Sequence, residues 1–223
     1  MPFMRLLIFI VSILSFKLSL GQTEFEKQYS SDVCSCVENM HLTTYTVDNF
    51  ITCFQDMLQK DSKQVIQEYK RIYGDTVFSE DRHFGRDLYE RIKVSLVGEC
   101  KTYAILLDSL RYNSIKKINQ DSVTIQLKNL DTVGSVRQNK DYYNQKSLLF
   151  FQSKMYDSSL ANANKVLNID SANTQAMYFK GWVDEIKGNY DEAIFLYDKV
   201  AALTKQDNFL IFSALAKRKK NGM

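Results

Sequence analysis

Apolar side chains recur every three or four positions over much of the N-terminal half of the chain, which is the spacing of helices that bury one face. This pattern predicts three helices, over residues 24–40, 47–73 and 87–118. Thr46 stands where a side-chain oxygen would cap the first turn of the second helix. We therefore expect a helical domain over residues 22–118.

The stretch from residue 119 to residue 138 lacks this helical period. Gln120-Asp121-Ser122 and Gly134-Ser135 are typical of turns. We interpret the stretch as a linker, with a short strand predicted at Val123 to Leu127.

The composition favours helices throughout. The only proline is Pro2, so the chain can form long helices without interruption, and eight glycines are few for a sandwich or barrel. Hydrophobic residues make up 45% of the chain, enough to bury a core. The predicted fold class is all-α.

From Lys140 onward the sequence repeats itself at a period of 34 residues. The second copy carries Gly181, Gly188, Tyr190, Ala193 and Tyr197. The same positions of the first copy hold Ser147, Lys154, Tyr156, Ser159 and Ala163. Small residues let two antiparallel helices approach closely, and a glycine suits the turn between them.

This repeat resembles the tetratricopeptide (TPR) repeat, whose pattern positions the second copy matches. The resemblance implies two antiparallel helical hairpins over residues 139–207. An apolar-faced capping helix over residues 208–223 follows, and its end, from Lys217 to Lys220, is basic and complements the helix dipole.

In TPR proteins the first helix of each hairpin lines a groove that binds peptides or protein segments. The resemblance places six residues of this chain in such a groove: Asn144, Leu148, Phe151, Tyr178, Trp182 and Glu185. Trp182 and Phe151 are candidate anchors for a partner, although aromatic residues at helical spacing also form cores. The groove has no pair of basic residues to clamp a terminal carboxylate.

Residues 1–21 have the three parts of a signal peptide. Arg5 precedes an apolar run of 11 residues, and small residues stand before a cleavage site at Gln22. The run is shorter than the about 20 residues that span a bilayer, so we expect no stable membrane span after cleavage. The segment resembles those of exported proteins of Bacteroidota-type bacteria, which predicts a periplasmic or secreted protein.

Four cysteines follow this segment: Cys34, Cys36, Cys53 and Cys100. An even count in an exported chain indicates disulfides. Cys34 and Cys36 face different directions on a helix, so we expect two bridges that tie the first helix to the second and third. Two alternatives stay open. One is a redox-active pair formed by Cys34 and Cys36. The other is a zinc site held by four thiolates, or by three with His41 or His83.

The sequence has few other residues that would indicate nucleic-acid binding, cofactor binding or catalysis. Without Arg5 and Lys17 the chain has 27 basic and 26 acidic residues, which gives no basic surface for nucleic acid. No glycine-rich phosphate loop or nucleophile–base pattern is present in the sequence, so we expect neither a cofactor nor an enzyme.

These patterns predict an exported adaptor that binds another protein or peptide segment through its helical repeats. The alternatives are a thiol–disulfide oxidoreductase that uses Cys34 and Cys36, and a structural subunit of an envelope assembly. Because two repeats are few for an independent array, we expect the array either to pack on the N-terminal domain or to form a homodimer.

Overall fold

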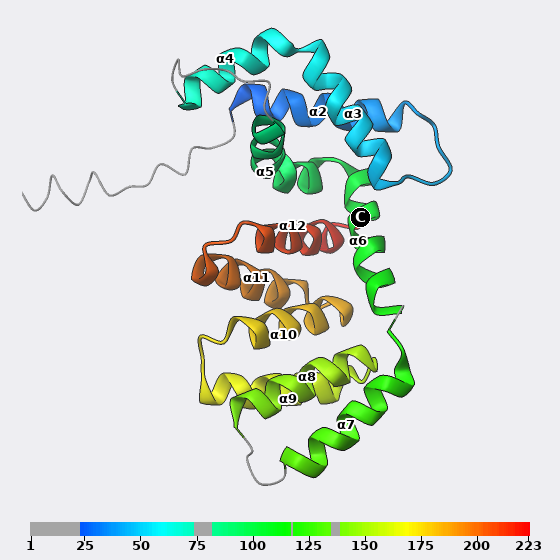
Figure 1. Cartoon of the computed structure of the whole chain (residues 1–223), viewed down its shortest axis with the longest axis vertical. Coiled ribbons are helices and arrows are strands. Elements are labelled where there is room, and N and C mark those ends of the chain that lie inside the picture. The colour runs from blue at the N-terminus through cyan, green and yellow to red at the C-terminus, as the bar shows by residue number, and fades with distance from the viewer. Residues whose placement is uncertain (1–22, 74–81, 117, 135–138) are drawn as a thin grey trace, which may run out of the picture.

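The computed structural model describes residues 23–73, 82–116, 118–134 and 139–223 (Figure 1). The predicted signal peptide lies outside these ranges. All regular elements within them are helices: α2 (Glu24–Glu38), α3 (Val47–Lys60), α4 (Ser62–Tyr73), α5 (Arg82–Glu99), α6 (Lys101–Lys116), α7 (Gln120–Gly134), α8 (Lys140–Gln152), α9 (Tyr156–Ile169), α10 (Thr174–Ile186), α11 (Tyr190–Thr204) and α12 (Asn208–Lys220). The predicted all-α class is confirmed. None of these helices combines the length and the apolarity that a membrane-spanning helix needs.

The N-terminal helices share one core. Helix α2 packs on α3 and α5, and buries Val33 and Val37 against Phe50 and Ile92. Thr23 caps α2 and Thr46 caps α3, each in a reciprocal pair with the residue three positions later. The predicted helices of this region are confirmed, but the second and the third are each divided into two helices. Asp61 separates α3 from α4, and Cys100 separates α5 from α6.

The C-terminal helices pack in sequence as antiparallel neighbours. Helices α8 and α9 form one hairpin, α10 and α11 a second, and α12 packs on α11 (Figure 1). In the first hairpin the hydroxyl of Ser147 donates to the carbonyl oxygen of Ser159 at 3.0 Å, and the Ser159 hydroxyl donates to the Ser147 carbonyl oxygen at 2.8 Å. Gly181 and Ala193 stand at these positions in the second hairpin, and both are buried.

The backbone follows the 34-residue period at the end of α8, α10 and α12. Lys154 has a φ of 59°, Gly188 a φ of 81° and Gly222 a φ of 83°. These three residues are spaced 34 positions apart, and each follows a helix in the left-handed conformation that ends it. Lys154 therefore adopts the left-handed conformation that a glycine adopts at each of the other two positions.

Helix α12 joins the two halves of the chain. Its Leu215 belongs to the core of the N-terminal helices, while its Ala216 packs against Ala193 and Tyr197. Arg218 donates to the carbonyl oxygen of Gly98 at the end of α5, at 2.5 Å. The hairpin array thus packs on the N-terminal helices through α12.

The predicted short strand at Val123 to Leu127 is wrong, because residues 120–134 of the predicted linker form helix α7. Asn119 accepts a hydrogen bond from the amide of Ser122 at 3.1 Å, which starts the helix. Val123 is buried and Leu127 partly buried, and α7 packs against α8. Gln120, Asp121 and Ser122, which are typical of turns, are exposed in the first turn of α7.

Candidate functional site

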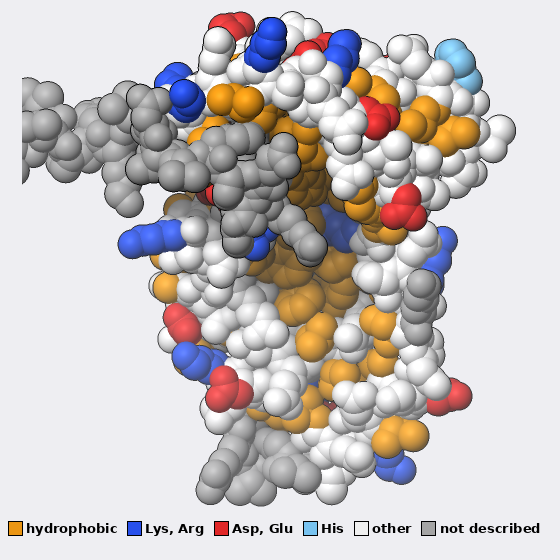
Figure 2. All heavy atoms as spheres, turned by 45° about the horizontal axis from the view of Figure 1, so that its top comes forward, with side chains coloured by type: hydrophobic (Ala, Val, Ile, Leu, Met, Phe, Trp, Pro, Cys, Tyr) orange, Lys and Arg blue, Asp and Glu red, His pale blue; other side chains and the backbone are white. Residues whose placement is uncertain are grey.

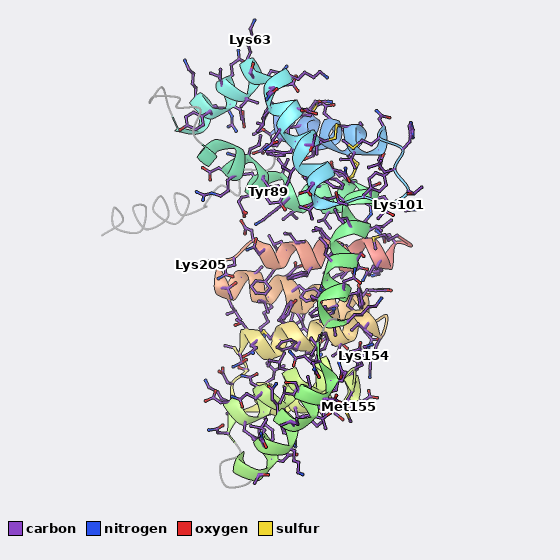
Figure 3. The ribbon with its side chains drawn as sticks, turned by 45° about the vertical axis from the view of Figure 1, so that its right-hand side comes forward. Lys63, Tyr89, Lys101, Lys154, Met155 and Lys205 are labelled. Atoms are coloured by element: carbon purple, nitrogen blue, oxygen red, sulfur yellow. A yellow bond between two sulfur atoms is a disulfide. The ribbon has the colours of Figure 1, made fainter. Side chains whose placement is uncertain are left out.

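Helix α6 runs along the ends of α12, α10 and α8 (Figures 1 and 3). Asp108 of α6 accepts a hydrogen bond from Lys219 of α12 at 2.6 Å. Further along α6, Ile115 packs in one cluster with Phe151 of α8 and Trp182 of α10. Helix α6, which follows the N-terminal helices in the chain, therefore packs against the side of the array on which the predicted groove residues Phe151 and Trp182 lie.

Arg111 is the centre of this contact. Its guanidinium lies 4.1 Å from the ring centroid of Trp182 and 4.5 Å from that of Phe212. It donates to a carboxylate oxygen of Glu185 at 2.8 Å and to the hydroxyl of Tyr197 at 2.6 Å. That hydroxyl in turn donates to the same Glu185 oxygen at 2.8 Å. One arginine is thus held by side chains from α10, α11 and α12.

The charges of this cluster are balanced inside the protein. Glu185 also accepts a hydrogen bond from Lys219 at 2.8 Å, and its side chain is fully buried. Burial by itself raises the pKa of Glu185, but Arg111 and Lys219 outweigh it and hold the pKa below its usual value. Burial lowers the pKa of Arg111, and Tyr197 and Glu185 more than compensate, so it stays charged. The cluster is a buried ion network and not a surface salt bridge.

Four of the six predicted groove residues are buried in contacts within the chain. Trp182, Phe151 and Glu185 pack against α6, and the ring centroids of Trp182 and Phe151 lie 4.5 Å apart. Asn144 is buried and lies 3.4 Å from Asn173, within hydrogen-bonding distance. Helix α6 of the same chain covers the part of the array where Trp182, Phe151 and Glu185 lie.

The other two predicted residues, Leu148 and Tyr178, are partly exposed. Tyr178 belongs to a row of aromatic rings, with centroids 5.3 Å from Phe212 and 5.7 Å from Phe209. Phe179, also partly exposed, lies 5.5 Å from Phe151. Figure 2 shows a hollow lined by hydrophobic side chains on one face of the molecule. These partly exposed aromatic rings come from α10 and α12, and Tyr178 is the predicted groove residue among them.

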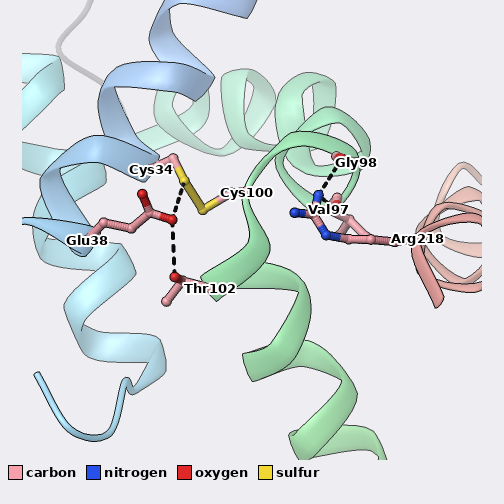
Figure 4. The surroundings of a disulfide bond; sticks show 7 residues. All are labelled: Cys34, Glu38, Val97, Gly98, Cys100, Thr102 and Arg218. Atoms are coloured by element: carbon pink, nitrogen blue, oxygen red, sulfur yellow. Dashed lines mark hydrogen bonds between the residues drawn. A yellow bond between two sulfur atoms is a disulfide. The ribbon is translucent and has the colours of Figure 1, made fainter. Parts of the chain in front are cut away.

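The cysteines form two disulfides, Cys34–Cys100 (Figure 4) and Cys36–Cys53. Cys34 and Cys36 have different partners, and the bridges join α2 to α3 and to the end of α5, as predicted. The alternative of a Cys34–Cys36 pair is therefore not the arrangement found. Cys34, Cys100 and Glu38 cluster closely, but the two sulfurs are bonded to each other and are not thiolate ligands. The side chain of His83 lies outside the described residues.

Arg111, Asp108 and Lys219 are not among the site residues that the sequence predicts. Two features of the sequence indicate Arg111 and Lys219. Arg111 stands four residues after Leu107 and four before Ile115, within the apolar stripe of α6. Lys219 stands 34 residues after Glu185, so the network pairs opposite charges at equivalent positions of the repeat.

Comparison with known proteins gives no relative for this chain. No family model matches it, and no curated protein and no solved structure matches it significantly.

Proposed function

We propose that this chain is an exported, non-enzymatic adaptor that binds an apolar segment of another protein on the aromatic face of its helical array. The partly exposed rings of Tyr178, Phe179 and Phe209 carry the proposal. A hollow lined by hydrophobic side chains on one face of the molecule (Figure 2) supports it. Aromatic side chains supply large contact areas at protein interfaces, and exposed apolar surface of this kind marks interaction sites.

The TPR resemblance belongs to this proposal. The antiparallel hairpins and the 34-residue spacing of Lys154, Gly188 and Gly222 support it. The two disulfides are consistent with an oxidising compartment, which fits an exported protein.

A photo-crosslinking experiment tests the proposal. The benzophenone analogue of phenylalanine is placed at Phe179 or, as a matched control, at Phe195, which is 58% exposed on α11. We expect position 179 to crosslink one partner protein from the exported fraction and position 195 to crosslink none. Phe179→Ala should then weaken capture of that purified partner, and Phe195→Ala should not.

Two results would reject the adaptor function: equal crosslinking at both positions, or none at either. A structural subunit is the second candidate, because α6 already covers part of the array. That candidate predicts crosslinks between copies of this chain, and light scattering of the purified protein would then detect a homodimer or a larger assembly.

A further inference from the structure

The two disulfides share one pattern of exposure. In each, a partly exposed cysteine of α2 is bonded to a buried cysteine elsewhere in the fold, Cys34 to Cys100 and Cys36 to Cys53. Cys100 is 1% exposed and Cys53 is 0% exposed. A thiolate opens a disulfide by attacking one of its sulfurs, and access helps to decide which sulfur it attacks. Thiols from solution therefore reach both bridges through α2.

A carboxylate lies at one of these two entry points. An oxygen of Glu38, one turn after Cys34 in α2, lies 3.5 Å from the Cys34 sulfur (Figure 4). The same oxygen accepts a hydrogen bond from the hydroxyl of Thr102 in α6 at 3.2 Å, which holds the carboxylate in this position. Within the residues that the structure describes, no carboxylate lies within 4.8 Å of both sulfurs of the other bridge. The two bridges thus differ in the charge beside the attacked sulfur, although their exposure is alike.

A negative charge beside the attacked sulfur slows thiol–disulfide exchange. The attacking thiolate brings its own negative charge to Cys34, and the carboxylate of Glu38 repels it during the approach. In water, the repulsion between two unit charges about 4 Å apart corresponds to a factor of roughly five in rate. A thiol that carries a second negative charge is repelled more strongly, whereas a positive charge on the thiol offsets the repulsion. The position of Glu38 therefore makes this bridge selective for the charge of the reagent.

The buried end of the same bridge lies at the junction of α5 and α6. Helix α5 ends at Glu99 and α6 begins at Lys101, so Cys100 is the residue between the two helices. Attack at Cys34 forms a bond between its sulfur and that of the thiol, and breaks the bond to Cys100, which leaves as a thiolate and takes up a proton from water. A second thiol then releases Cys34 as a thiolate and leaves as the disulfide of the reagent. The start of α6 is then no longer bonded to α2.

We propose that Cys34 is a thiol-modification site at which Glu38 favours neutral and cationic thiols over anionic ones, and that opening of the Cys34–Cys100 bridge releases the start of α6. The reductant that the site fits is a thiol without further negative charge around its sulfur. This proposal does not depend on the adaptor function, because it is measured on the purified protein without any partner. Its failure leaves the crosslinking at Phe179 unaffected.

The experiment follows the opening of both bridges in the purified, oxidised protein. The probes are 2-mercaptoethanesulfonate, an anionic thiol, and cysteamine, a cationic thiol, at equal concentrations of thiolate. Samples are quenched with acid and alkylated, and peptide mass spectrometry assigns the mixed disulfide and the free thiol of each bridge. We expect the adduct of the longer bridge on Cys34, with Cys100 as the free thiol. Glu38→Gln should speed opening of this bridge by 2-mercaptoethanesulfonate at least roughly fivefold, and opening by cysteamine clearly less.

Two controls make this result specific. The Cys36–Cys53 bridge, measured in the same samples, should accelerate much less in the Glu38→Gln variant. Glu24→Gln removes the same charge from α2 at a side chain that is 92% exposed, and should leave the rates of both bridges unchanged. A first adduct on Cys100, no acceleration by Glu38→Gln, or an equal acceleration of both bridges or with both reagents would overturn the site.

Release of α6 is read from Trp182, the only tryptophan, which contacts Arg111 of α6. We expect its emission to change at the rate at which Cys34–Cys100 opens, and not at the rate at which Cys36–Cys53 opens. An emission that stays unchanged after complete opening of Cys34–Cys100 would overturn the release of α6.

Discussion

The guanidinium of Arg111 lies over the ring of Trp182, 4.1 Å from its centroid, although the two residues belong to different halves of the chain. Trp182 also packs against Phe151, with the two ring centroids 4.5 Å apart. A residue that the sequence offers as a binding anchor thus fastens α6 to the array. The stability of the whole protein should therefore depend on this contact.

Glu185→Gln should strongly destabilise the protein. The carboxylate is fully buried and accepts from Arg111, Lys219 and Tyr197. Its loss leaves the buried Arg111 without its counter-charge and Lys219 with Asp108 alone. We expect the free energy of unfolding in urea to fall by about 3–5 kcal/mol. The control is Asp198→Asn, which removes a pair with Lys217 whose side chains are 44% and 56% exposed. Its effect should stay below about 1 kcal/mol, and equal losses in the two variants would contradict the network.

The same carboxylate should make stability depend on pH in the acid range. Its pKa is lowered in the folded protein, while the pKa in the unfolded chain is about 4.3. Its contribution is therefore complete above that value and is lost as the pH falls through the lower folded pKa. We expect the gap in unfolding free energy between wild type and Glu185→Gln to shrink from pH 7 to pH 3, measured by urea titrations. A gap that stays constant would show that Glu185 does not ionise as described.

Gly181→Ala should destabilise the second hairpin. A Cβ at this position would lie 3.1 Å from the Tyr197 ring and 3.3 Å from the Leu196 Cβ, in a buried interface that cannot easily widen. We expect a loss of about 1–3 kcal/mol in denaturant unfolding. Gly98→Ala is the matched control, since it stands in helix α5 and nothing lies within 4 Å of the place that its Cβ would take. It should be neutral or stabilise by up to about 1 kcal/mol, because alanine favours helix.

The helical pattern and the cysteine spacing predict much of the fold, because both depend on neighbours along the chain. Thr46 caps its helix and the two bridges leave α2 as expected. The break at Cys100 and the helix α7 are not predicted. Cys100 stands in an uninterrupted apolar stripe, and α7 needs α8 to cover Val123, which no local pattern reveals.

The candidate site is less predictable than the fold. Trp182 and Glu185 are found from the repeat, but what they contact depends on Arg111, which lies 74 residues from Glu185 in the chain. A charged residue within an apolar stripe indicates only that a buried partner is needed. It does not identify that partner.

The turn after α8 offers a test of the 34-residue structural period. Lys154 has a φ of 59°, a conformation that strains any residue with a Cβ, while Gly188 holds the equivalent place without strain. Lys154→Gly should raise the free energy of unfolding by roughly 1 kcal/mol, and Gly188→Ala should lower it by a similar amount. Thermal melts of the two variants should shift in opposite directions. Shifts of the same sign would mean that the two turns are not equivalent.

The two disulfides should differ in what they contribute. The bridge Cys34–Cys100 closes a sequence separation of 66 residues, and Cys36–Cys53 one of 17. A cross-link stabilises mainly by limiting the unfolded chain, and the effect grows slowly with the loop, to roughly 4 kcal/mol for the longer and roughly 3 kcal/mol for the shorter. Paired Cys→Ala variants, unfolded in denaturant, should therefore rank in that order. The longer bridge also fixes the start of α6, so its loss should alter the emission of Trp182, whereas loss of the Cys36–Cys53 bridge should not. An unchanged emission without Cys34–Cys100 would show that the contacts of Arg111, Asp108 and Ile115 with the array keep α6 in place without the bridge.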